Sequence, residues 1–131
     1  MALSPHDTIE ITQLYARYNQ TVDSGDGDGF AACFAPEGVL QIGAGDPISG
    51  RDALADFARS LPTIVPGIRH HATNVVVDGG DDDDDAIGSA YLLVLVTGSE
   101  ASIMMTGRYQ DLLRRENGRW AFVRRFLEPD A

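Results

Sequence analysis

The second half of the chain contains four strand-length segments joined by short polar connections, and this arrangement limits the possible folds most strongly. The connections read GGDDDDD, GSEAS and ENG. Short stretches of this kind between apolar runs are typical of hairpins. The pattern therefore predicts successive antiparallel strands over His70–Asp78, Ala86–Thr97, Ile103–Arg115 and Trp120–Glu128.

Helical periodicity precedes these strands. Ser4, Pro5 and Asp7 form a helix start, with a capping side chain, a proline in the first turn and a box-like S-x-x-D spacing. The apolar stripe that follows ends in the glycine-rich loop DSGDGDG. The stripe residues are Ile11, Leu14, Tyr15, Tyr18 and Val22.

The middle of the chain is broken into shorter elements. The segment DGFAACFA is expected to form a short helix ended by Pro36, and GVLQIG a strand. A third helix is expected over GRDALADFARSL, before a proline-broken connector. Helices followed by a run of strands predict an α+β fold, a curved antiparallel sheet with helices on one face. Curled around a helix, such a sheet makes a cone with an apolar pocket, and 131 residues fit one domain over 1–131.

Charge narrows the choice of partners. Twenty acidic and ten basic residues give a net charge of −10, half of it in the run Asp81–Asp85. A surface of this sign repels phosphate backbones and anionic membranes, so no nucleic-acid or membrane partner is expected.

The first residues include Asp7 and Glu10 rather than an apolar leader, which favours a cytoplasmic protein. Cys33 is the only cysteine, lies among apolar residues, and is expected to be buried and inert.

Two acidic segments could suggest a metal, but neither fits one well. If DSGDGDGF is aligned to a calcium loop, Ser24 and Ala35 fall on the first and last ligand positions, where carboxylates are needed. Five successive aspartates cannot all converge on one ion, so a solvated hairpin tip is the simpler interpretation. No metal site is expected.

Adjacent pairs of polar residues present a choice that the residues alone leave open. His70 and His71 are neighbours at the start of a strand, as are Arg124 and Arg125 near the end of another. Successive side chains of a strand point to opposite faces, so at most one of each pair turns inward. Asp23 lies near the negative end of a helix dipole, where an acid needs a compensating partner such as a histidine.

Four segments together carry a resemblance to a known family. They read LYARYNQTVDSGDGDGFAACFAPEG, GRDALADFA, IRHHATNVVVDG and GRYQDLLRRENGRWAFVRR. In this order they resemble the SnoaL-like family of the ketosteroid-isomerase and nuclear-transport-factor-like superfold. Within it the chain is most similar to the lyase branch of scytalone dehydratase, bile-acid 7α-dehydratase and hexachlorocyclohexane dehydrochlorinase. The resemblance implies a cone-shaped α+β barrel.

The resemblance also implies a site. The branch's catalytic Asp matches Asp23, and its His, four residues before an Asn, matches His70 in HHATN. An active-site Tyr matches Tyr18, and the last-strand Arg matches Arg125, with Arg124 one register away. Relatives carry a second acid–base group on the strand that corresponds to AYLLVLV of this chain. This chain has no such group there, which predicts a more apolar pocket. Its expected lining is Tyr15, Phe57, Tyr91 and Leu93.

The function implied is a cofactor-independent lyase that eliminates water or another leaving group from a small, mostly apolar cyclic or polyketide-like molecule. His70 would be the base, Asp23 its orienting partner, and Tyr18 and Arg125 the groups that stabilise negative charge. An isomerase or cyclase with the same base remains an alternative, as does a non-catalytic ligand-binding or assembly module. The resemblance further implies a homo-oligomer, either trimer or dimer.

Overall fold

The computed structural model describes residues 2–131 and begins with a long helix, α1 (Pro5–Ser24). The predicted capping box is confirmed. The Ser4 hydroxyl accepts the Asp7 N–H at 3.0 Å, and the Asp7 carboxylate accepts the Ser4 N–H at 3.2 Å. The helix ends where the glycine-rich loop begins. Gly25 adopts a left-handed conformation with φ of 75°, which glycine reaches without steric cost.

The short helix α2 (Gly27–Ala31) ends earlier than predicted. Strand β1 (Phe34–Ile42) follows at once and includes Pro36. Phe34 and Ala35 are buried, so packing favours an extended chain here. Pro36 is tolerated because its missing N–H falls in the interruption of the pairing with β6 between Phe34 and Val39.

Helix α3 (Arg51–Ile64) runs beyond the predicted end and contains Pro62 in its last turn. A six-stranded sheet is completed by β2 (Ile48–Ser49), β3 (Ile68–Gly79), β4 (Asp85–Val96), β5 (Ser102–Glu116) and β6 (Arg119–Pro129). The order is β2-β1-β6-β5-β4-β3, so the predicted hairpins β3–β4, β4–β5 and β5–β6 are all present. One pair differs from the prediction, because β1 runs parallel to β6.

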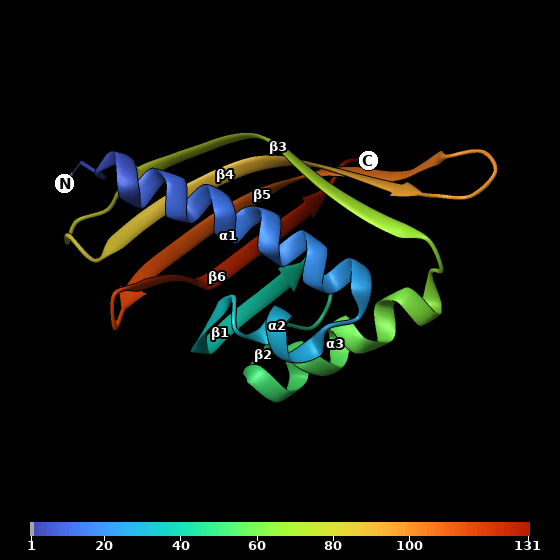
Figure 1. Cartoon of the computed structure of the whole chain (residues 1–131), viewed down its shortest axis with the longest axis horizontal. Coiled ribbons are helices and arrows are strands. Elements are labelled where there is room, and N and C mark those ends of the chain that lie inside the picture. Colours follow the sequence, from blue (N-terminus) through green and yellow to red (C-terminus); the bar gives the residue numbers. More distant parts are fainter. Residues whose placement is uncertain (1) are drawn as a thin grey trace.

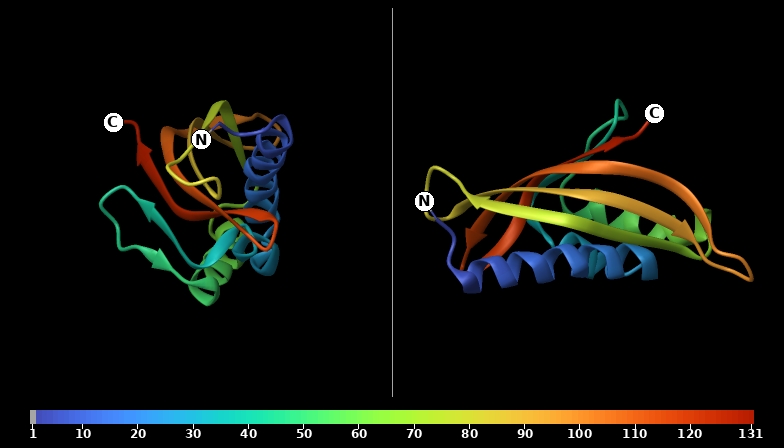
Figure 2. Two further views of the ribbon diagram at one scale, coloured as in Figure 1. Left: turned by 90° about the vertical axis from the view of Figure 1, so that its left-hand side faces the viewer. Right: turned by 90° about the horizontal axis from the view of Figure 1, so that it is seen from above.

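The sheet is curved, and α1 lies along the face that the strands bend around (Figures 1 and 2). It does not close into a barrel, since β2 and β3 remain at its two edges. Helix α3 covers the same side near β1 and β2 (Figure 1). The expected α+β fold, a curved sheet with helices on one face, is thus confirmed, and the sheet stays open at its two edges.

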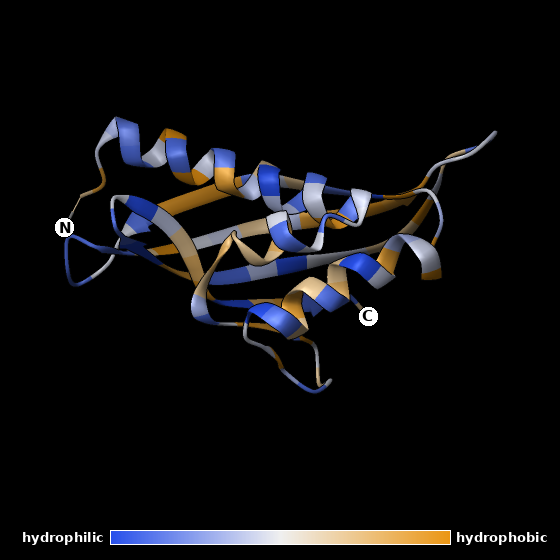
Figure 3. Cartoon of the chain, turned by 60° about the horizontal axis from the view of Figure 1, so that its bottom comes forward, coloured by the Kyte–Doolittle hydropathy of each residue, from blue (hydrophilic) through white to orange (hydrophobic). Residues whose placement is uncertain are grey.

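One hydrophobic core lies between the helices and the sheet. Apolar and polar residues alternate along both long helices in Figure 3, as expected for helices with one buried face. Buried residues of α1 meet those of β4, β5 and β6, and aromatic rings fill the centre. Members of the aromatic cluster are Tyr15, Tyr18, Phe30, Phe34, Tyr109 and Phe122.

Candidate active site

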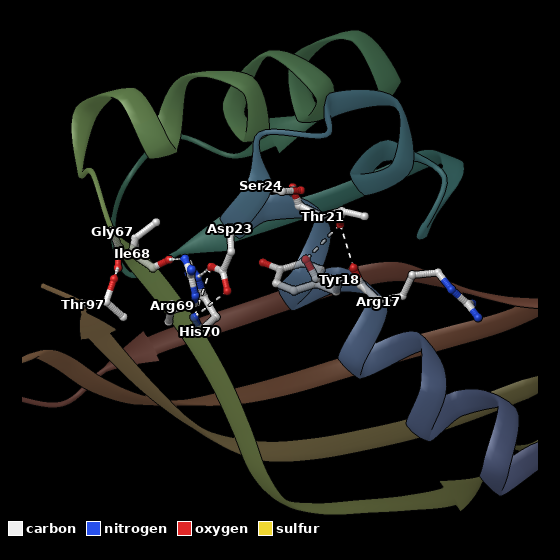
Figure 4. Close-up of polar contacts among 10 residues, drawn as sticks. All are labelled: Arg17, Tyr18, Thr21, Asp23, Ser24, Gly67, Ile68, Arg69, His70 and Thr97. Carbon is white, nitrogen blue, oxygen red and sulfur yellow. Dashed lines mark hydrogen bonds and ion pairs between the residues drawn. The ribbon is translucent and has the colours of Figure 1, made fainter. Parts of the chain in front are cut away.

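The last turn of α1 and the start of β3 bring Asp23 and His70 together (Figure 4). Oδ1 of Asp23 lies 2.6 Å from Nδ1 of His70. The same carboxylate accepts the backbone N–H of His70, at 3.0 and 3.1 Å to its two oxygens. Both side chains are about nine-tenths buried, with 11% exposed. Asp23 therefore has the histidine partner that its place at the helix end requires, and it fixes both the ring and the backbone of His70.

This contact determines which ring nitrogen is free. An ionised carboxylate can only accept hydrogen bonds, so the proton in the contact belongs to Nδ1 of His70. In the neutral ring Nε2 then carries the lone pair. A ring held in this way can take a proton at Nε2 while Asp23 stabilises the imidazolium that forms.

The two adjacent histidines differ as strand alternation requires. His70 pairs with Val94, a core residue, and is largely buried, whereas His71 pairs with Leu93 and is exposed. The choice that the sequence left open is therefore made by the strand. His70 is the histidine that turns toward α1.

An open groove of about 540 Å³ lies between α1 and β3, with the Asp23–His70 pair at one end. One wall is a single face of α1, whose lining residues follow one another at intervals of about one helical turn. The other wall is the edge strand β3. The groove can hold a small molecule in contact with the histidine ring. Its lining is Thr12, Tyr15, Ala16, Asn19, Gln20 and Asp23 from α1, and Arg69, His70, His71, Ala72, Thr73 and Val75 from β3.

Arg125 lies elsewhere, in the core between α1 and the sheet, with 0% of its surface exposed. Its Nε is 3.1 Å from Oδ1 of Asp111, the residue directly opposite on β5. Its guanidinium carbon lies 3.3 Å from the ring centroid of Tyr109 and 4.3 Å from that of Tyr18. Aromatic faces attract cations, so these rings partly compensate for the lost hydration. Within residues 2–131, no guanidinium nitrogen of Arg125 has a well-aligned hydrogen bond.

Burial and charge act against each other in this pair. Burial raises the pKa of Asp111 above its ordinary value, although Arg125 and a hydrogen bond from the Tyr15 hydroxyl favour the ionised form. For Arg125, burial alone would lower the pKa, but Asp111 and the surrounding tyrosines hold it above its ordinary value. The pair is therefore a buried ion pair that depends on both partners being present.

A β-bulge selects Arg125 over Arg124. Trp120 and Phe122 are inward residues of β6, so strict alternation would turn Arg124 inward. The pairing with β5 shifts at Val123, because Leu113 pairs with Phe122 and Leu112 with Arg124. The extra residue reverses the alternation, and Arg124 is exposed.

Tyr18 also belongs to the core and not to the groove. It is 3% exposed, and its ring packs against Phe30, Phe34, Tyr109 and Phe122. Burial raises the pKa of its hydroxyl well above the ordinary value. The four polar residues singled out from the sequence thus divide into two sets. Asp23 and His70 border the groove, and Tyr18 and Arg125 lie in the packed interior behind it.

The four expected pocket residues are similarly divided. Tyr15 lines the groove, while Phe57 packs against the core from α3 and borders a different depression. Tyr91 and Leu93 lie on the other face of β4, because Ala90, Leu92 and Val94 take the inward positions. Tyr91 is 55% exposed, so these two residues do not share a pocket with His70.

Sequence reasoning missed Asp111 and Asn19. Asp111 lies between Tyr109 and Leu113, both inward on β5, so the alternation placed a carboxylate at an inward position. That pattern could have revealed it. Asn19 falls four residues before Asp23 on the buried face of α1. A polar residue inside an apolar helix stripe was the available signal.

The acidic loops have structural roles among the described residues. Asp26 caps α2 by accepting the Gly29 N–H at 2.9 Å, and Asp28 pairs with Arg59 at 2.9 Å. At the hairpin tip, Asp84 pairs with Arg115 at 3.0 Å.

In residues 2–131 no three His, Cys, Asp or Glu side chains are gathered as a metal would need. No helix within that range is long and apolar enough to cross a membrane.

Comparison with known proteins adds a family and several structures. A family model described as the SnoaL-like domain matches residues 5–126. A protein of unknown function from Mycobacterium tuberculosis is similar, with 32% identity and a TM-score of 0.85 over 99% of this chain and 78% of that one. A Nostoc punctiforme protein of unknown function, described as having a cystatin-like fold, gives 29% identity and a TM-score of 0.88, with coverages of 99% and 96%.

A third similar structure comes from Novosphingobium aromaticivorans and is described as a candidate scytalone dehydratase. It gives 22% identity and a TM-score of 0.81, covering 95% of this chain and 84% of that one. At this identity the likeness concerns the fold alone. Comparison with curated proteins gives no match.

Proposed function

The chain belongs to the SnoaL-like domain family, and on that basis we propose that it is a lyase in which His70 is the base. The observation that carries the proposal is the 2.6 Å contact between Asp23 and Nδ1 of His70 at the end of an open groove. The similar structure described as a candidate scytalone dehydratase is consistent with a dehydratase-type elimination. The proposed substrate is a small, mostly apolar cyclic or polyketide-like molecule.

The elimination divides into two proton movements at one nitrogen. Nε2 of His70 removes a proton from the carbon beside a carbonyl, and the electron pair of that C–H bond becomes an enolate. The enolate then forms the C=C bond as the β-hydroxyl leaves with its bonding pair. The imidazolium returns its proton to that hydroxyl, which departs as water, so His70 ends neutral. Asp23 stabilises the charged ring between the two steps.

Tyr18 and Arg125 receive a different role from the one implied by the family resemblance. Both are enclosed by aromatic rings, with exposures of 3% and 0%. We propose that they support the wall behind the groove and do not touch the substrate. Their contacts favour a role in positioning α1, the helix that carries Asp23.

The proposal is tested with three variants and a panel of β-hydroxyketones and halogenated rings assayed in D₂O. His70→Ala is expected to lower turnover by about 10²- to 10⁴-fold, the range typical of a lost general base. His71→Ala is the matched control. His71 also borders the groove, but Asp23 holds the ring of His70 and not that of His71, so turnover should stay close to that of the native protein. Asp23→Asn should lower turnover strongly, because an amide no longer selects the productive tautomer.

The same assay separates elimination from isomerisation. Release of water or halide with loss of the substrate hydroxyl or halogen supports a lyase. Deuterium exchange at the acidic carbon without any release would favour the isomerase or cyclase alternative. Equal loss in His70→Ala and His71→Ala, or none in either, would contradict the assignment of His70 as base.

A further inference from the structure

Asn19 lines the groove, and its side-chain oxygen is buried without a hydrogen-bond partner. The residue lies on α1, one turn before Asp23 and one turn after Tyr15, and it lines the groove with them. Only 8% of its surface is exposed. Among residues 2–131 no group donates a hydrogen bond to its Oδ1.

This arrangement is costly for the folded chain. A buried acceptor without a donor costs about 1–3 kcal/mol, and buried polar atoms are nearly always paired. Asparagine is also a weak helix former, and it interrupts the apolar stripe of α1. The packing of the fold therefore does not explain Asn19. A donor supplied from the groove does, once the amide turns toward it, because hydrogen bonding would then remove the penalty.

The neighbouring groups indicate what kind of donor fits. The Tyr15 hydroxyl is committed to Asp111, so it does not serve Asn19. Ala16 and Ala72 give the groove small apolar walls. Asn19 and Asp23 are separated by about 6 Å along the helix axis, which is the rise of four residues and roughly the span of one or two six-membered rings.

We propose that Oδ1 of Asn19 accepts a hydrogen bond from a hydroxyl group of the substrate, and that Asn19 thereby determines specificity. The substrate class is a one- or two-ring molecule that carries a hydroxyl about one helical turn from the carbon presented to His70. This deepens the proposed function and rests on it for the position of the reacting carbon. Recognition of the hydroxyl itself requires only the groove and Asn19.

The experiment compares two probes that differ in one hydrogen-bond donor, 2-naphthol and 2-methoxynaphthalene, titrated into the ¹⁵N-labelled full chain and followed by NMR. We expect 2-naphthol to bind about three- to tenfold more tightly, the contribution of one neutral hydrogen bond. It should also shift the Asn19 side-chain amide signals. Asn19→Leu should remove the preference, so that both probes bind alike. Gln13→Leu, an exposed amide on α1 outside the groove lining, is the matched control and should keep it.

Stability provides a second readout. Leucine has the same branching and number of side-chain heavy atoms as asparagine and leaves no unpaired acceptor, so the melting temperature of Asn19→Leu should equal or exceed that of the native protein. A clear fall would show that the oxygen has a structural partner and would overturn the proposal. Equal binding of the probes by the native chain, failure to bind 2-naphthol at millimolar concentration, or a preference that survives in Asn19→Leu would also overturn it.

One further variant separates this proposal from the proposed lyase activity. His70→Ala should still prefer 2-naphthol, because the hydroxyl is read by Asn19. If His70→Ala keeps full turnover on an identified substrate while the preference depends on Asn19, the lyase mechanism fails and the specificity role stands. A preference lost in His70→Ala but kept in Asn19→Leu would assign the hydroxyl contact to the histidine, against the proposal.

Discussion

Asp111 and Arg125 face each other across β5 and β6, and their ion pair is shielded completely from solvent. Nε of Arg125 is 3.1 Å from Oδ1 of Asp111, and both side chains are 0% exposed. Tyr15 donates its hydroxyl hydrogen bond to the other carboxylate oxygen. The pair thereby connects the two central strands to α1, the helix that carries Asp23.

Removing one partner of this ion pair should destabilise the protein. Asp111→Asn leaves the Arg125 charge buried without its counter-ion, and we expect a loss of about 3–5 kcal/mol in the free energy of unfolding. Urea denaturation at pH 7 measures it. The double variant Asp111→Leu with Arg125→Met, which removes both charges, should recover much of the loss. A cost below about 1 kcal/mol for Asp111→Asn would show that the two charges are not coupled in this way.

Tyr18→Phe tests whether the core tyrosine touches the substrate. The ring packing is kept and only the buried hydroxyl is lost, so turnover should change by less than about threefold if Tyr18 is a supporting residue. Steady-state kinetics on a substrate that His70→Ala fails to convert give the comparison. A loss of about 10²-fold or more would restore Tyr18 as a group that stabilises the developing oxyanion.

Gly88 makes room for the Tyr15 hydroxyl. It is the β4 partner of Asp111, and a Cβ atom at this position would overlap the Tyr15 hydroxyl and meet the ring carbon that bears it at 3.3 Å. Gly88→Ala should therefore destabilise the protein by about 1–3 kcal/mol through overpacking. Tyr15→Phe in the same chain removes the overlapping oxygen, so a double-mutant cycle should show a coupling of at least about 0.5 kcal/mol. Additive effects would contradict the overlap.

Asp7 should make the protein sensitive to acid. Trp120 donates its indole N–H to the carboxylate at 3.1 Å, and with the Ser4 contacts it holds the pKa of Asp7 below its ordinary value, against partial burial. A lowered pKa in the folded state contributes stability above the ordinary value near 4, and that contribution is lost as the pH falls through the folded-state pKa. Asp7→Asn should thus be less stable than the native chain at pH 7, with a difference that shrinks toward pH 2. Denaturation midpoints across this range measure it, and a constant difference would oppose the assignment.

The outer face of the sheet supports the prediction of a homo-oligomer. Ile87, Tyr91 and Leu112 are 54%, 55% and 50% exposed there, and Ile87 and Leu112 are directly paired across β4 and β5. Exposed apolar side chains gathered on one face favour an interaction surface. We expect light scattering to report a dimer or trimer, and Leu112→Glu to shift it toward the monomer. Ile64→Glu, at an exposed position on α3, is the control and should leave the assembly unchanged. A native protein that is monomeric at high concentration would contradict the prediction.

Much of the fold could be predicted from local sequence. The capping box at Ser4 and Asp7, the apolar stripe of α1 and the three hairpin connections depend on neighbouring residues, so their patterns were visible. The parallel pairing of β1 with β6 was not, because it joins segments about 85 residues apart and no local pattern encodes it. The early end of α2 was missed because burial of Phe34 outweighed helical periodicity.

For the site, the sequence by itself determined that at most one histidine of the pair His70 and His71, and one arginine of the pair Arg124 and Arg125, could turn inward. The reason is that side chains alternate along a strand. The family resemblance selected His70 and Arg125, but it did not reveal that they serve different places. Tertiary structure decided that. The bulge at Val123 reversed the alternation of β6 and buried Arg125 against Asp111, while β3 remained an edge strand beside α1. Groove and core are thus separated by packing between distant segments, which a linear pattern of residues does not contain.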